Sequence, residues 1–88
     1  MTYLYILLLK NNRLYKGLTD DLRRRFAEHK RGKVKSTKNL RPIKLIYYEA
    51  YLNKKDATRR EKFLKTTKGR RLLRQQLKEV LKEYKIEI

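Results

Sequence analysis

The 88 residues include 26 Lys or Arg against nine Asp or Glu, a formal net charge of +17, and no cysteine. A chain of this length buries only roughly 60–65% of its surface, so it has room for one small core, and without cysteine it has neither disulfides nor thiolate metal sites. So large a positive charge predicts a polyanionic partner, with nucleic acid as the first candidate and an anionic membrane surface as the second. The alternative is a ribosome-associated or merely soluble basic protein.

The first predicted element is a strand from Thr2 to Lys10. The apolar run 4–9 covers both alternating faces, which is typical of a central strand buried above and below. The run is far shorter than the about 20 residues that cross a bilayer, and no basic segment precedes it. We therefore expect a strand, with no membrane span and no signal peptide, and the lack of cysteine agrees with a cytoplasmic protein. Residues 10–13 predict a hairpin turn, since Asn tolerates positive φ, and Tyr15–Leu18 returns as the second strand.

A helix is predicted from about Asp20 to Arg31, after a polar cluster that can cap it. Leu22 and Phe26 are four residues apart and should face inward together. Arg25 and His29 have the same spacing and share a neighbouring stripe. This register predicts a fixed cation and a titratable imidazole side by side, close to the packed face.

The next stretch, residues 32–42, is a basic loop. It is either a solvated linker or a loop that contacts phosphates over the active face, and its density of cations favours the second interpretation. The side chains that we expect to contact nucleic acid, in this loop and ahead of it, are Lys16, Arg24, Lys33, Lys35, Lys38 and Arg41.

The remaining sequence predicts one more strand and two more helices. Ile43–Tyr51 is β-branched and aromatic, as in a strand. A helix should begin near Asn53 or Asp56 and end before Gly69, and a C-terminal amphipathic helix should cover about residues 70–84. The predicted fold is therefore α+β, with three antiparallel strands flanked by helices in the order ββαβαα, and residues 1–88 form one domain.

Glu61 has an unusual position in the predicted helix after the third strand. Ala57 and Leu64 flank it on the inward stripe, where an ionised carboxylate is costly unless a partner satisfies it. Lys65, one turn on, could pair with it, or a divalent cation could bind it. Glu49 is a rival carboxylate, but it lies at the end of a strand and is expected only to cap or pair.

Two short segments, Tyr3-Leu4-Tyr5 and Tyr15-Lys16-Gly17, resemble the paired motifs of the GIY-YIG nuclease domain. The spacing to Arg25 and Glu61 fits as well, and the resemblance covers about residues 2–68. It is closest to small stand-alone members related to the N-terminal nuclease domain of the excision-repair enzyme. Tyr3 and Lys16 replace a usual glycine and isoleucine, and neither change removes a reacting side chain.

The resemblance implies a metal-dependent endonuclease that hydrolyses phosphodiester bonds in DNA, in repair or recombination. Mg²⁺, or another divalent cation such as Mn²⁺, is implied at Glu61. A phenol with a pKa near 10 is a poor base unless nearby cations favour the phenolate, and the choice between the two motif tyrosines stays open. The alternatives are a nucleic-acid-binding module of the same fold without turnover and a basic RNA-associated structural protein. The implied catalytic residues are Tyr5, Tyr15, Arg25, His29 and Glu61.

Overall fold

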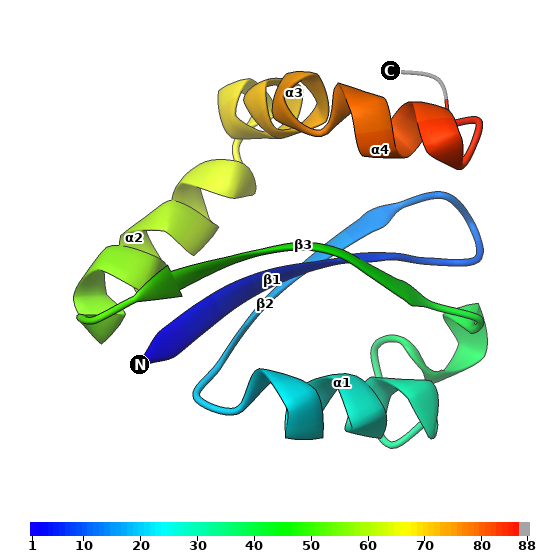
Figure 1. Cartoon of the computed structure of the whole chain (residues 1–88), viewed down its shortest axis with the longest axis horizontal. Coiled ribbons are helices and arrows are strands. Elements are labelled where there is room, and N and C mark those ends of the chain that lie inside the picture. The colour runs from blue at the N-terminus through cyan, green and yellow to red at the C-terminus, as the bar shows by residue number, and fades with distance from the viewer. Residues whose placement is uncertain (87–88) are drawn as a thin grey trace.

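The computed structural model describes residues 1–86 of the chain. A three-stranded antiparallel sheet in the order β2-β1-β3 forms its centre. Figure 1 shows α1 on one side of this sheet and the three later helices on the other. The elements are β1 (Thr2–Leu8), β2 (Leu14–Thr19), α1 (Leu22–Lys30), the 3₁₀ turn η1 (Lys38–Leu40), β3 (Lys44–Tyr51), α2 (Lys54–Leu64), α3 (Thr67–Gln76) and α4 (Lys78–Glu83).

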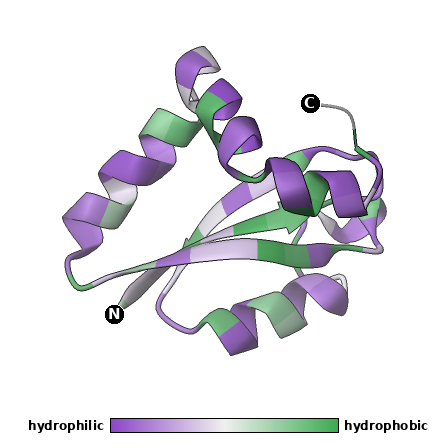
Figure 2. Cartoon of the chain, turned by 45° about the horizontal axis from the view of Figure 1, so that its top comes forward, coloured by the Kyte–Doolittle hydropathy of each residue, from purple (hydrophilic) through white to green (hydrophobic). Residues whose placement is uncertain are grey.

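The α+β fold with three antiparallel strands is confirmed, and β1 is the central strand that its two apolar faces predict. Leu4 and Ile6 pack in one hydrophobic cluster with residues of α2, α3 and α4. Tyr5 and Leu7 point the opposite way and pack in a second cluster, against which Phe26 of α1 lies. Figure 2 shows hydrophobic residues in the strands and hydrophilic residues over much of the helices.

Side chains cap the helices that carry the predicted site. Asp21 caps α1 by accepting a hydrogen bond from the backbone N–H of Arg24, and Asn53 caps α2 by accepting one from Lys55. Both caps accept from free amides of the first turn and so fix where each helix begins.

The predicted helix over 70–84 is wrong in its bounds, and Gly69 does not end a helix. α3 begins at Thr67, and α4 follows it after a break at Leu77. Gly69 lies inside α3. A Cβ at this position would collide with the carbonyl of Phe63, so the absence of a side chain lets α3 pack against the end of α2. No helix within residues 1–86 is long and apolar enough to cross a membrane.

Candidate active site

Four predicted catalytic side chains meet in one cavity of about 510 Å³ beside β2, an edge strand of the sheet. Tyr5 comes from β1, Tyr15 from β2, Arg25 from α1 and Glu61 from α2. The two helices lie on opposite sides of the sheet (Figure 1), and both reach the cavity. The sheet edge therefore joins residues that are far apart in the sequence.

Gly17 makes this meeting possible. It is paired with Tyr5 across β1 and β2, and a Cβ at position 17 would meet the ring and the hydroxyl of Tyr5. The bare glycine backbone leaves space for the Tyr5 ring to lie over β2. The Tyr5 side chain is only 1% exposed, yet it forms part of the cavity wall.

His29 is the buried partner of Tyr5. Its Nε2 atom lies 2.8 Å from the Tyr5 hydroxyl, and its Nδ1 atom lies 2.8 Å from Oγ1 of Thr37. The imidazole is 0% exposed. Both ring nitrogens are engaged and the ring is buried, so only the Tyr5 hydroxyl connects His29 to the cavity.

The three groups Tyr5, His29 and Thr37 have two consistent arrangements of protons. In one, the Tyr5 hydroxyl donates to Nε2 while Nδ1–H donates to the Thr37 hydroxyl. In the other, the Thr37 hydroxyl donates to Nδ1 and Nε2–H donates to Tyr5, which frees the phenol proton for the cavity. Burial, and then the Arg25 guanidinium, lower the pKa of His29, so the ring is neutral near pH 7 and can accept a proton.

Arg25 is the fixed cation of the site. Burial raises the pKa of Tyr5, and the nearby Arg25 guanidinium opposes that effect by favouring the phenolate. The guanidinium also donates to Oε1 of Glu28 at 3.0 Å, and its side chain is 36% exposed. Tyr5 and Glu28 together raise the pKa of Arg25 further, so it stays charged at every working pH.

Glu61 lies on the cavity wall with a 20% exposed side chain, and its Oε2 is 3.6 Å from Nζ of Lys65. The ion pair anticipated for this helix therefore exists. No group of three His, Cys, Asp or Glu residues within residues 1–86 is arranged to hold a metal. A Mg²⁺ ion, however, commonly takes only one or two protein carboxylates and fills its shell with water and phosphate oxygens. A single carboxylate at an open cavity fits that type of site.

Glu49, the rival carboxylate, is fully engaged elsewhere. It accepts hydrogen bonds from the hydroxyls of Tyr47 and Tyr51, at 2.7 and 2.6 Å, and from two nitrogens of Arg60. Burial alone raises the pKa of Glu49, but these hydrogen bonds outweigh it and hold the pKa below its ordinary value. Glu49 joins β3 to α2 and does not line the cavity.

The residues expected to contact nucleic acid lie in several places. Lys16 lines the cavity. Arg24 is 58% exposed and pairs with Asp20 and Glu28. The guanidinium of Arg41 donates to the carbonyls of Lys30 and Lys38. Arg41 therefore fastens the loop to the end of α1. The loop lysines, Lys33, Lys35 and Lys38, are exposed.

The loop over 32–42 is neither a plain linker nor irregular throughout. Val34 and Thr37 are buried, and the 3₁₀ turn η1 follows them. The loop supports the site through the Thr37 hydroxyl, which lies on His29. Sequence reasoning missed Thr37 and Arg70, and it named Lys65 only as a partner of Glu61, whereas Lys65 and Arg70 both line the cavity. A threonine among polar loop residues gives no sequence signal for such a role.

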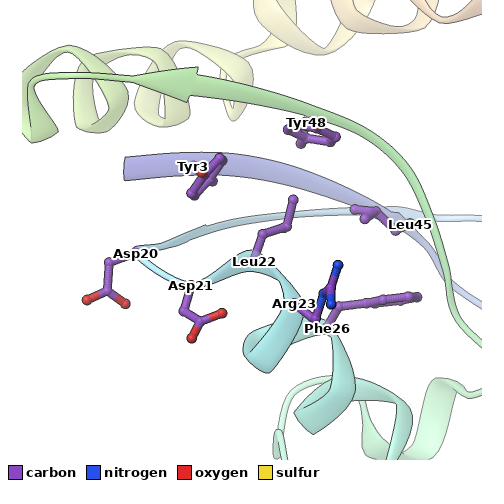
Figure 3. A pocket seen from close by; sticks show the side chains of 8 residues that line it. All are labelled: Tyr3, Asp20, Asp21, Leu22, Arg23, Phe26, Leu45 and Tyr48. Atoms are coloured by element: carbon purple, nitrogen blue, oxygen red, sulfur yellow. The ribbon is translucent and has the colours of Figure 1, made fainter. Parts of the chain in front are cut away.

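A different cavity, also of about 510 Å³, lies beside the N-terminal end of α1. Figure 3 shows its aromatic and aliphatic wall, with the carboxylates of Asp20 and Asp21 at one end. Tyr48, 53% exposed, stands edge-on to Tyr3 there. None of the predicted catalytic residues lines this cavity, and its acidic end does not suit a phosphate.

The comparisons with known proteins agree with this geometry. The family model described as the GIY-YIG catalytic domain matches residues 1–75. A UPF0213 protein of Staphylococcus haemolyticus is 45% identical over 65 residues, which cover 73% of this chain and 79% of that protein. One from Clostridium perfringens is 41% identical over 66 residues, covering 74% and 71%. The solution structure of a UPF0213 protein from Bacillus halodurans superposes with a TM-score of 0.54 at 34% identity, over 83% of this chain and 82% of that one.

Proposed function

This chain belongs to the GIY-YIG family, and on that premise we propose that it is a metal-dependent endonuclease that hydrolyses phosphodiester bonds in DNA. The observation that carries the proposal is the convergence of Tyr5, Tyr15, Arg25 and Glu61, from four elements, on one cavity. The net charge of +17 suits a polyanionic substrate.

In this proposal Tyr5 is the general base. It takes a proton from the attacking water as its own proton passes to Nε2 of His29, 2.8 Å away. A phenol alone is mostly protonated near pH 7, so it needs such an acceptor. Nδ1–H of His29 then donates to Thr37, which holds the imidazole in place. Tyr15, whose ring centroid is 6.3 Å from that of Tyr5, shapes the cavity beside it.

Arg25 would stabilise the negative charge that builds on the phosphate. Its planar guanidinium can donate two parallel hydrogen bonds to phosphate oxygens. Its contact with Glu28 leaves other N–H groups free to do so. A donor that meets developing negative charge commonly contributes about 10²–10³ in rate.

Glu61 would hold the divalent cation. When bound, such an ion supplies Lewis-acid stabilisation of the phosphate and its leaving oxygen. Lys65, now 3.6 Å from the carboxylate, is then available to a phosphate oxygen.

A nucleic-acid-binding module that does not cut DNA is the second candidate. The observation that favours it is the same ion pair, because a Glu61 that only holds Lys65 explains the inward carboxylate without any metal.

The test is a nicking assay on labelled duplex, branched and single-stranded DNA, with Mg²⁺ or with EDTA. Wild-type protein should nick at least one substrate in Mg²⁺ and none in EDTA. Arg25→Ala should lower the rate of nicking by a factor of about 10²–10³. Its DNA affinity should be unchanged, since the remaining cations still bind the phosphate backbone.

Arg24→Ala is the matched control. It removes the same charge one residue away, from a side chain that lies outside the cavity, and it should nick normally. Equal loss in both variants would deny Arg25 its role. The absence of Mg²⁺-dependent nicking on every substrate would leave the binding module as the function.

A further inference from the structure

A further, strongly basic cavity of about 350 Å³ adjoins the candidate active site. Arg13 and Lys16 line it from the hairpin and β2, and Arg70 and Arg74 from α3. Leu14 and Leu73 complete the wall. We refer to this feature as the basic cavity.

The four cations of the basic cavity have no acidic partner in the described part of the chain, residues 1–86. Within residues 1–86 none of them forms an ion pair with a carboxylate, unlike Arg24, Arg25, Arg59 and Arg60. Burial lowers the pKa of Lys16, and the neighbouring Arg70, Arg74 and Lys65 lower it further. Like charges that are held together repel one another, and a bound anion relieves that repulsion.

The basic cavity is continuous with the candidate active site. Leu14, Lys16 and Arg70 line both cavities. A strand whose phosphate lies against Arg25 and Glu61 can therefore continue along β2 toward Arg13 and Arg74, which line only the basic cavity. Arginine forks match phosphate oxygens better than a single ammonium does.

We propose that the basic cavity binds a further backbone phosphate of the same nucleic-acid strand, on one side of the bond that is cut. The site rests on the proposed function for its substrate, but its test needs no cleavage. It assigns to Arg13, Arg70 and Arg74 a role in positioning the strand, and it gives the site a direction along that strand.

The test variant is Arg13→Gln with Arg74→Gln, which leaves every residue of the active-site cavity intact. The control is Lys10→Gln with Arg71→Gln. It removes two charges from the same hairpin and the same helix, at exposed positions outside both cavities. Binding to a DNA duplex is measured in EDTA at several salt concentrations. The test variant should flatten the plot of log affinity against log salt by about 0.9 for each phosphate that is no longer neutralised, and more than the control does.

A scan with single methylphosphonate linkages, each of which removes one phosphate charge, then locates the contact. In wild type and control, a neutral linkage at one position should weaken binding. In the Arg13→Gln, Arg74→Gln protein that position should no longer matter. Equal weakening in both variants, or no position that depends on the two arginines, would overturn the proposal.

Thermal melting verifies that both variants fold. A second double variant, Arg13→Lys with Arg74→Lys, keeps both charges. Its affinity should lie between those of wild type and the glutamine variant, and it provides the comparison even if the glutamine variant does not fold. Nicking in Mg²⁺ is scored separately on the same preparations. If the test variant loses more affinity than the control and wild type does not nick DNA, the phosphate site is supported and the proposed nuclease activity is not. If wild type nicks DNA and the two variants lose affinity equally, the nuclease activity is supported and the phosphate site is not.

Discussion

The ring of Tyr15 stands edge-on to the imidazole of His29, with centroids 5.2 Å apart, and the ring of Tyr5 stands edge-on to the same imidazole at 5.6 Å. One buried histidine thus fixes both motif tyrosines, although it hydrogen-bonds only to Tyr5. The arrangement separates the two tyrosines chemically: the Tyr5 hydroxyl shares a hydrogen bond with Nε2 of His29, while Tyr15 only packs against the ring.

Thr37→Val should lower the rate of cleavage and the stability together. It removes the hydroxyl that holds Nδ1 of His29, and a buried polar group left without a partner costs about 1–3 kcal/mol. Single-turnover nicking and melting temperature measure the two effects. Thr37→Ser keeps the hydroxyl and should restore the rate; if serine were as slow as valine, the hydroxyl would not be the relevant group.

Stability should fall as the pH drops below about 6.5, the ordinary pKa of histidine. The fold lowers the pKa of His29, so in this window the unfolded chain binds a proton that the folded chain does not. The slope is at most about 1.4 kcal/mol per pH unit. Nicking should slow at still lower pH, as His29 itself becomes protonated. Melting temperatures of wild type and His29→Gln from pH 5 to 8 test this, because only wild type should show the slope in that window.

Gly17→Ala should lose both stability and nicking. The new methyl group would meet the Tyr5 ring, which must then leave its place beside His29, and overpacking of this kind costs about 1–3 kcal/mol. Gly69→Ala is the comparison, because its methyl group would meet the backbone of Phe63, outside the site. That variant should melt earlier yet nick at the normal rate below its melting temperature. Normal nicking by a folded Gly17→Ala protein would contradict this role of the glycine.

Glu61→Gln should fold, bind DNA in EDTA at least as tightly as wild type, and fail to nick in Mg²⁺. It removes the charge that holds a cation and preserves the side-chain size. Glu49→Gln should instead lower the stability of the fold and leave nicking in Mg²⁺ intact. Its three partners would lose a charged acceptor, at a cost of about 1.5–3 kcal/mol each in principle, while nicking persists. Mg²⁺-dependent nicking by Glu61→Gln would exclude Glu61 from the site.

The sequence predicts the sheet and the chemical groups better than it predicts their supports. The apolar run 4–9 identifies the central strand, and motif spacing brings Tyr5, Tyr15, Arg25 and Glu61 to one cavity. Helical spacing also puts His29 close to the packed face, but only the folded loop shows that both of its nitrogens are occupied. Such a contact depends on a turn that polar loop residues do not specify.

The errors at the C-terminal end have a common physical origin. Gly69 is typical of a helix end when only neighbours in sequence are considered, whereas its actual role is a close approach to Phe63 of another helix. Leu73, Leu77 and Leu81 are all buried, so the apolar stripe continues across the break at Leu77, and periodicity alone does not reveal that break. Arg70 and Arg74 lie on a helix in the prediction as well as in the structure, but periodicity does not show that Arg13 and Lys16 lie opposite them, which is why the basic cavity escaped prediction.

The place of β1 at the centre of the sheet has a consequence for biosynthesis. β1 is made first and its neighbour β2 soon after, but its other partners come late, since Ile6 pairs with Tyr47 and shares a hydrophobic cluster with Leu81. A growing chain therefore leaves one edge and one face of β1 uncovered until almost all of residues 1–81 have been made. An uncovered strand of this kind is prone to aggregate. The net charge of +17 also keeps nascent chains apart by mutual repulsion.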